Sequence, residues 1–162
     1  MGAGKASGAL ARLLDSEVTL SPPEIYLTPV SEIPGLIGGP QQMVVGTYAS
    51  LSGDVPGTVL IVYSTQAAMQ LADLLQSKEL GTTKTLTEKD QIRIKEVGNT
   101  LTKFYLQSLV GFLELKIKPS EERIVSTFGE SLTDLVLLGI KEKYAILIKT
   151  HFAVPKTKAE GE

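Results

Sequence analysis

The longest helical pattern in the chain runs from Thr87 to about Leu113. Thr87 and Asp90 have the spacing of a capping box, with Asp in place of the usual Glu or Gln, which is typical of a helix start. At about 100° per residue, the positions expected on the buried side of this helix are Ile94, Val97, Leu101, Phe104, Tyr105, Ser108 and Phe112. The sequence therefore predicts one long amphipathic helix that covers a hydrophobic core.

The opposite side of this helix carries Glu96 and Asn99, which are three residues apart and therefore neighbours on its surface. Ile92 and Lys103 flank this pair along the same stripe. Gly98 and Asn99 are both weak helix formers, yet they are adjacent here. The stripe is predicted to face solvent or a partner, and its periodicity alone also agrees with an ordinary solvated face.

Shorter elements are predicted on both sides of the long helix. The helical segments are residues 3–14, one or two turns within 30–37, a helix that Ser64 or Thr65 caps, and residues 132–138. The strands are residues 17–20, 24–28, 43–51, 58–63, 115–117, 123–126 and 144–154. Residues 52–57 contain Ser, Gly, Asp and Pro, and they predict a hairpin turn between the third and fourth of these strands.

An internal repeat is indicated when the chain is shifted against itself by 99 positions without gaps. Leu10 then meets Leu109, and Ile25 meets Ile124, so the match is one of apolar pattern with little identity. The alternative is that any two helix–strand–strand–helix–strand segments share such a pattern. The predicted fold is α+β: a single layered domain with a mixed, largely antiparallel sheet packed against two long helices, related by an internal pseudo-twofold repeat.

The predicted domain spans residues 1–154 of the 162. Its repeat halves are about 1–50 and 100–154, with a hairpin–helix insert at 51–99, and residues 155–162 are expected to form a flexible tail. A chain of this length with 43% apolar residues can build a full core without disulfide or metal support.

Composition excludes several classes of function. Cysteine is absent, which removes thiol nucleophiles and cysteine metal sites and agrees with a reducing compartment. The formal net charge is -2, so no overall positive field attracts nucleic acid. No apolar run approaches the roughly 20 residues of a transmembrane helix, and the start does not have the pattern of a signal peptide. We therefore expect a cytoplasmic protein with no nucleic-acid partner and no membrane insertion.

Three strings of residues stand out together: Glu96-Val97-Gly98-Asn99 within the long helix, the stretch Met43 to Ile61, and the stretch Gly2 to Leu10. They resemble three parts of the CheC, CheX and FliY group of chemotaxis phosphatases, and of CheC most of all. These parts are the helix signature, the central hairpin and the stretch after a first copy of the helix signature. The resemblance covers Gly2 to about Val154.

This resemblance implies a protein phosphatase that hydrolyses the aspartyl phosphate of a phosphorylated, CheY-like chemotaxis response regulator. Glu96 would pair with the active-site lysine of the regulator, and Asn99 would place the attacking water. Ile92 and Lys103 would contact the same partner. The regulator would bind the magnesium ion, so no cofactor or metal site of its own is expected in this chain.

Two departures from the family pattern favour an alternative function. The family often has Asp or Ser four residues before the Glu, whereas this chain has Ile92. The repeat shift also places the Asn of a first motif immediately before Met1, so that motif lies outside the chain as given. The alternative is a non-catalytic chemotaxis module that binds the CheD deamidase or belongs to the flagellar switch. A ligand-sensing α+β domain is a third hypothesis, but no convergent polar cluster supports it.

Overall fold

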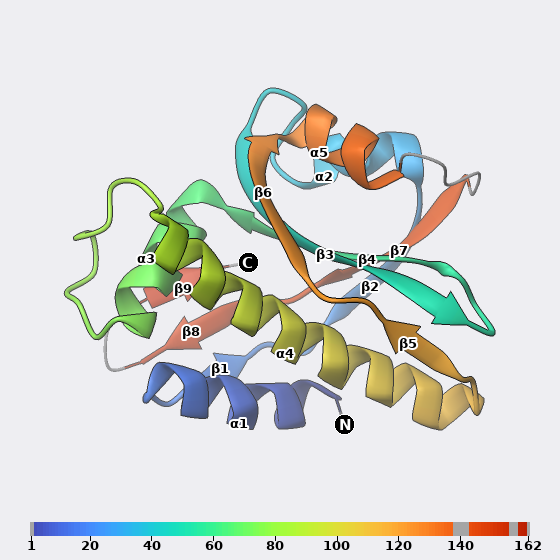
Figure 1. Cartoon of the computed structure of the whole chain (residues 1–162), viewed down its shortest axis with the longest axis horizontal. Coiled ribbons are helices and arrows are strands. Elements are labelled where there is room, and N and C mark those ends of the chain that lie inside the picture. Colours follow the sequence, from blue (N-terminus) through green and yellow to red (C-terminus); the bar gives the residue numbers. More distant parts are fainter. Residues whose placement is uncertain (1, 138–142, 156–158, 162) are drawn as a thin grey trace.

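Helices α1 (Gly2–Leu14) and α4 (Glu88–Leu113) lie side by side on one side of the strands (Figure 1). This computed structural model describes residues 2–137, 143–155 and 159–161. The predicted long helix is confirmed, with 26 residues in α4. The shorter helix α3 (Thr65–Leu75) packs against α4 and begins at Ser64, whose side chain accepts a hydrogen bond from the Ala67 N–H, as a capping residue does.

The central sheet is built around β3 (Met43–Gly53). On one edge β3 pairs with β4 (Gly57–Ser64), which confirms the predicted hairpin. On the other edge it pairs with β5 (Ile117–Pro119) and β6 (Arg123–Phe128). Thr47 lies in the middle of this sheet, opposite Ile61 of β4 and Ile124 of β6. Because side chains alternate along a strand, Val45 and Thr47 face α4, whereas Val44 and Gly46 face the other way.

A second layer of short elements covers the other face of the sheet (Figure 1). It contains η1 (Val30–Glu32), α2 (Ile33–Leu36) and α5 (Gly129–Leu137). Leu132 of α5 is fully buried against Val44, and a Cβ added at Gly46 would lie 2.8 Å from a Leu132 methyl group. The glycine at position 46 therefore allows α5 to sit directly on β3.

The remaining strands are short and antiparallel in every pairing that the described residues make. They are β1 (Thr19–Leu20), β2 (Glu24–Pro29), β7 (Tyr144–Lys149), β8 (Phe152–Val154) and β9 (Ala159–Gly161). β2 pairs with β7, and β8 pairs with both β1 and β9. The strands thus form three sheets, and the α+β class with largely antiparallel pairing is confirmed.

Two boundaries differ from the prediction. The single strand expected at 144–154 is divided into β7 and β8, because its partner strand contains Pro22 and Pro23, which have no N–H groups to continue the ladder. Residues 159–161, expected in a flexible tail, form β9 because the backbone of β8 offers them an edge for pairing. Residues 156–158 and 162 of that predicted tail, and Met1, lie outside the described residues.

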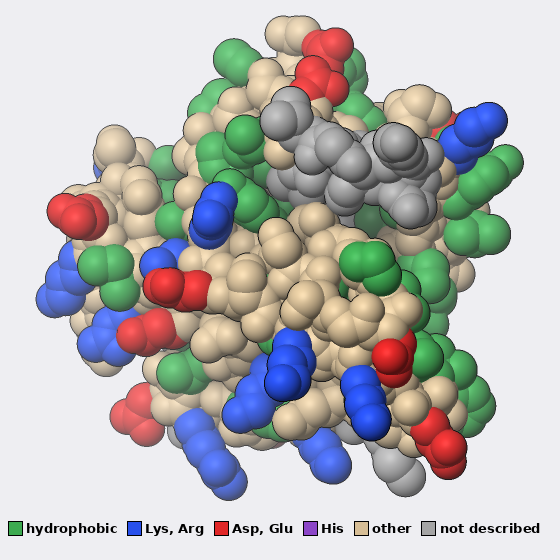
Figure 2. All heavy atoms as spheres, turned by 45° about the vertical axis from the view of Figure 1, so that its right-hand side comes forward, with side chains coloured by type: hydrophobic (Ala, Val, Ile, Leu, Met, Phe, Trp, Pro, Cys, Tyr) green, Lys and Arg blue, Asp and Glu red, His purple; other side chains and the backbone are tan. Residues whose placement is uncertain are grey.

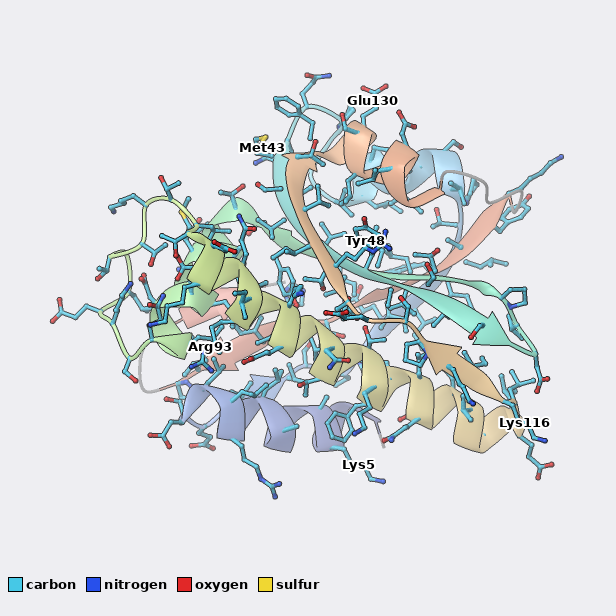
Figure 3. The ribbon with its side chains drawn as sticks, in the orientation of Figure 1. Lys5, Met43, Tyr48, Arg93, Lys116 and Glu130 are labelled. Carbon is cyan, nitrogen blue, oxygen red and sulfur yellow. The ribbon has the colours of Figure 1, made fainter. Side chains whose placement is uncertain are left out.

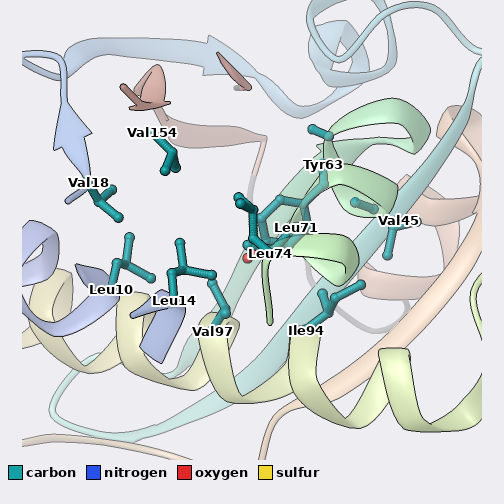
Figure 4. Close-up of a cluster of buried hydrophobic side chains, with 12 residues drawn as sticks. Leu10, Leu14, Val18, Val45, Tyr63, Leu71, Leu74, Ile94, Val97 and Val154 are labelled. Atoms are coloured by element: carbon teal, nitrogen blue, oxygen red, sulfur yellow. The ribbon is translucent and has the colours of Figure 1, made fainter. Parts of the chain in front are cut away.

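The main hydrophobic core lies between α1, α3, α4 and β3–β4 (Figure 4). Its buried side chains include Leu10, Leu14, Val45, Tyr63, Leu71, Leu74, Ile94 and Val97. Phe112 was predicted on the buried side of α4, but 87% of it is exposed. That prediction was wrong because the C-terminal end of α4 extends beyond α1, so periodicity there does not bring burial (Figure 1).

The order of elements is the same in the two stretches that the 99-residue shift aligns. The first stretch has α1, β1, β2, η1–α2 and β3, and the second has α4, β5, β6, α5 and β7. The aligned side chains are not equally buried, since Leu10 is in the core and Leu109 is 42% exposed. The internal duplication and its boundaries therefore stay predictions.

Candidate functional site

Ile92, Glu96, Asn99 and Lys103 are all exposed and follow one another along the outward side of α4. This placement agrees with the stripe that the helical periodicity predicts. Figure 2 brings the right-hand side of Figure 1 forward, and the lower part of its surface, at the level of α1, α4 and β5, carries several Lys, Arg, Asp and Glu side chains. The stripe combines an anion, a carboxamide, a cation and an apolar side chain on an exposed surface.

The start of α4 is fixed by its capping box. The Thr87 Oγ1 accepts a hydrogen bond from the Asp90 N–H at 3.3 Å, and the Asp90 Oδ2 accepts one from the Thr87 N–H at 2.8 Å. The Thr87 hydroxyl also donates a hydrogen bond of 2.7 Å to the Asp90 Oδ2, and the Asp90 Oδ1 accepts one from Gln76 of the preceding segment. Burial alone would raise the pKa of Asp90, but the bonds that its carboxylate accepts from the Thr87 hydroxyl, the Thr87 N–H and Gln76, together with the charge of Lys78, lower it below its ordinary value.

The connection between α3 and α4 is held by a second buried carboxylate, Asp73. Its oxygens accept hydrogen bonds from the N–H groups of Gly81, Thr82 and Thr83 at 2.8, 3.1 and 2.8 Å. Burial alone would raise the pKa of Asp73, but these three N–H groups and the Thr83 side chain lower it overall. Two buried carboxylates, one on each side of this connection, therefore hold the N-terminal part of α4 in place.

The middle of α4 rests on β3. Gly98, the third residue of the predicted motif, is buried and faces Thr47. Glu96 and Asn99, on either side of it in the same helical turn, are exposed. Position 98 therefore marks the buried side of the turn whose outer side bears the two predicted site residues.

The charged neighbours of the site were missed by the sequence analysis. The Arg93 Nη1 lies 3.3 Å from the Glu96 Oε2, and Arg93 extends from the N-terminal half of α4 (Figure 3). The Lys95 Nζ lies 3.7 Å from the Glu121 Oε1. The i,i+3 spacing of Arg93 and Glu96 is a signal that could have predicted the first pair. No local signal connects Lys95 with Glu121, which is distant in sequence.

Glu122, next to Glu121, is buried against α4 with 4% of its surface exposed. Its Oε1 accepts a hydrogen bond of 2.6 Å from the Thr102 Oγ1, and its Oε2 has no partner among the described residues. Burial raises the pKa of Glu122, although the bond from Thr102 acts in the opposite direction. The segment 121–122 is therefore fastened to α4 one turn from Asn99.

The described residues contain no group of acidic, histidine or cysteine side chains that could hold a metal ion. No helix in the described part of the chain is long and apolar enough to span a membrane. Two hollows of the described surface, one beside Pro29 and Tyr144 and one between β4 and β7, are not lined by α4. The stripe is an exposed helix face, which is suited to contact another macromolecule.

No family model matches the chain. The curated protein CheY-P phosphatase CheC of Bacillus subtilis (strain 168) is 24% identical over 158 residues, which are 93% of this chain and 74% of CheC.

Solved structures share the fold at low sequence identity. FliY of Thermotoga maritima matches with a TM-score of 0.71 and 15% identity, over 94% of this chain and 76% of FliY. FliM from the Helicobacter pylori FliG–FliM complex matches with a TM-score of 0.69 and 9% identity, over 98% and 83% of the two chains. The CheX–CheY–BeF3–Mg complex of Borrelia burgdorferi matches with a TM-score of 0.58 and 18% identity, over 99% and 91%.

The fold is therefore that of a class of chemotaxis and flagellar proteins. Within this class, the chain is similar in sequence to CheC and shares its fold with FliY and with the CheX–CheY complex, which agrees with the resemblance to the CheC/CheX/FliY group. The roles of Ile92, Glu96, Asn99 and Lys103 stay predictions.

Proposed function

We propose that this protein hydrolyses the aspartyl phosphate of a phosphorylated, CheY-like response regulator, with Asn99 and Glu96 as the residues that act on it. The observation that carries the proposal is the exposure of a carboxylate and a carboxamide in one turn of a well-anchored helix. Two comparisons support the choice of substrate. One relative is named as a CheY-P phosphatase, and the fold is shared with a structure of a CheX–CheY complex.

The reaction is attack of water on phosphorus in line with the acyl oxygen of the phosphoaspartate. A new P–O bond forms, the bond to the aspartyl oxygen breaks, and the products are a free carboxylate and inorganic phosphate. The Asn99 carboxamide can accept a hydrogen bond from this water through Oδ1 and donate one to a phosphoryl oxygen through Nδ2. Among the described residues nothing bonds to the Asn99 side chain, so both groups are available to a partner.

The remaining residues of the stripe would hold the regulator. Glu96 supplies an anion for the regulator's active-site lysine, which orients the helix over the phosphate. Lys103, one turn beyond Asn99, places a cation near an acidic, phosphorylated surface, and Ile92 adds an apolar contact. The chain needs no cofactor or metal of its own in this scheme, because the magnesium ion belongs to the regulator. We place the reaction in the cytoplasm.

The proposal is tested by single-turnover dephosphorylation of a phosphorylated regulator. Asn99→Ala should lower the rate constant by at least about 100-fold, as expected when a group that orients a reactant is lost, with little change in regulator affinity. Glu96→Ala should mainly weaken binding. Gln107→Ala removes another exposed polar side chain of α4 and serves as the matched control. Equal rates for Asn99→Ala and the wild type would contradict the proposal.

A second candidate is a non-catalytic partner of the CheD deamidase or of the flagellar switch. The fold shared with FliM from a complex with FliG, together with the apolar Ile92 in the stripe, favours it. In this case the Glu96→Ala/Asn99→Ala double variant should still bind its partner, and the wild type should not dephosphorylate the regulator.

A further inference from the structure

Gly98 and Thr47 form an unusually close contact between α4 and the centre of the sheet. A Cβ added at Gly98 would lie 2.3 Å from the Thr47 Oγ1, 2.9 Å from its Cβ and 3.2 Å from its Cγ2. Thr47 is fully buried and is paired on both sides, with β4 and with β6, so its backbone has little freedom to retreat. The helix therefore touches the strand with its backbone at this position.

The second glycine of α4, Gly111, lies in an open position, and the comparison shows that the close contact is specific to Gly98. A Cβ added at Gly111 would meet no atom within 4 Å. Both residues weaken the helix interior relative to alanine. At Gly111 nothing in the described structure requires glycine, whereas at Gly98 only glycine fits.

The contact depends on shape rather than on a hydrogen bond. The buried Thr47 Oγ1 makes no hydrogen bond to α4, and the polar group within its reach is the buried Tyr63 hydroxyl of β4. Valine has nearly the same shape as threonine, so it would leave the separation of α4 and β3 unchanged while removing the hydroxyl. The side chain at position 47 therefore sets the distance between α4 and β3.

We infer that Gly98 is a positioning residue whose contact with Thr47 sets the height and rotation of the α4 turn that carries Glu96 and Asn99. This inference rests on the proposed function only where it concerns catalysis. Asn99 directly follows Gly98, and Glu96 lies two residues before it. Restoring an ordinary contact of 3.4 Å after addition of a methyl group requires a movement of about 1 Å.

A movement of this size matters for a water that must be placed in line with a breaking bond. Misplacement of a reacting group by about 1 Å can lower a rate by roughly 100-fold. Gly98→Ala should therefore lower the rate constant for dephosphorylation by about that factor, and it should change regulator affinity much less. Gly111→Ala, in the same helix, should leave both quantities unchanged.

The decisive experiment is a cycle of Gly98→Ala and Thr47→Gly, with Thr47→Val as a further control. Unfolding by urea, the NMR shifts of the Asn99 side-chain amide and the rate constant are measured for each variant. Thr47→Gly removes all three atoms that the new Cβ would strike. The amide shifts and the rate constant of the double variant should therefore be close to those of Thr47→Gly alone, so that adding the methyl group at position 98 no longer has an effect. Thr47→Val should keep the wild-type shifts and rate.

The inference is overturned if Gly98→Ala has wild-type amide shifts, or if the amide shifts of the double variant differ from those of Thr47→Gly alone. Should Gly98→Ala fail to fold, recovery of folding in the double variant supports the inference, and its absence contradicts it. Absence of turnover in the wild type would instead refute the proposed function, while the NMR and urea measurements would still test the contact.

Discussion

Arg93 and Glu96 form an ion pair on the outer surface of α4, with the Arg93 Nη1 3.3 Å from the Glu96 Oε2. About half of each side chain is exposed. The contact involves one nitrogen and one carboxylate oxygen, so it is not the bidentate arrangement that makes such pairs strong. In the free protein, the anion proposed to bind the regulator's lysine is thus already paired with a cation of the same helix.

This pair should compete with the regulator. Exposed ion pairs contribute about 0.2–1 kcal/mol, so Arg93→Gln should tighten binding of the regulator by at most about fivefold at low salt. The gain should shrink at high salt and disappear in a Glu96→Gln background. Titration calorimetry at two salt concentrations checks this, with Lys89→Gln as the control for loss of one positive charge. Weaker binding by Arg93→Gln than by Lys89→Gln would show that Arg93 does not compete.

Asp73 should make the fold sensitive to acid. Asp73→Asn removes the charge that three backbone N–H groups bond to, and it should lower the free energy of unfolding by about 1–3 kcal/mol at pH 7. The folded-state pKa of Asp73 is lowered, so its stabilisation is present above the unfolded pKa of about 3.9 and is lost as the pH falls below it.

Urea unfolding between pH 3 and 7 measures this effect. The difference between the wild type and Asp73→Asn should narrow as the pH falls through about 4. Asp134→Asn alters an exposed carboxylate of α5 and should show no such trend. A difference that is constant over this range would mean that the charge of Asp73 does not contribute.

Glu122 should have the opposite pH dependence. Burial raises its folded-state pKa, so the folded protein takes up a proton more readily than the unfolded chain does. Relative to Glu122→Gln, the wild type should therefore gain stability as the pH falls from 7 toward about 4.3, the ordinary pKa of Glu. Paired urea titrations measure the difference, and Glu121→Gln changes the exposed neighbour as a control. A gain on raising the pH would contradict the assignment.

Thr87 should stabilise α4 through the capping box. Thr87→Ala removes the oxygen that accepts from the Asp90 N–H, and it should lower the free energy of unfolding by about 1 kcal/mol. Thr87→Ser keeps this oxygen and should retain most of the stability. Chemical denaturation of the three proteins provides the comparison, and equal losses for Ala and Ser would show that the methyl group, not the cap, matters.

The features that sequence predicted well are local ones. The spacing of Thr87 and Asp90 predicted the start of α4, because a capping box is formed within one turn. The helical period placed Glu96 and Asn99 on the outward side, because all residues of one helix share the same rotation. The central hairpin followed from two β-branched runs and a turn composition between them.

The features that sequence missed depend on contacts between distant segments. Periodicity gave the orientation of Phe112 but not its exposure, which depends on which distant segments reach that end of α4. Glu122 carries no local mark of burial, since the strand and helix that enclose it come together only in the fold. Gly98 is similar: its weak helix propensity was visible, but the contact with Thr47 that explains it was not.

The outward side of α4 is an exposed helix face that lines neither of the two hollows described above. An inhibitor of this surface would therefore have to cover a helix face rather than fill either hollow. A short stabilised helix that copies the spacing of Ile92, Glu96, Asn99 and Lys103 is the more promising starting point for an inhibitor.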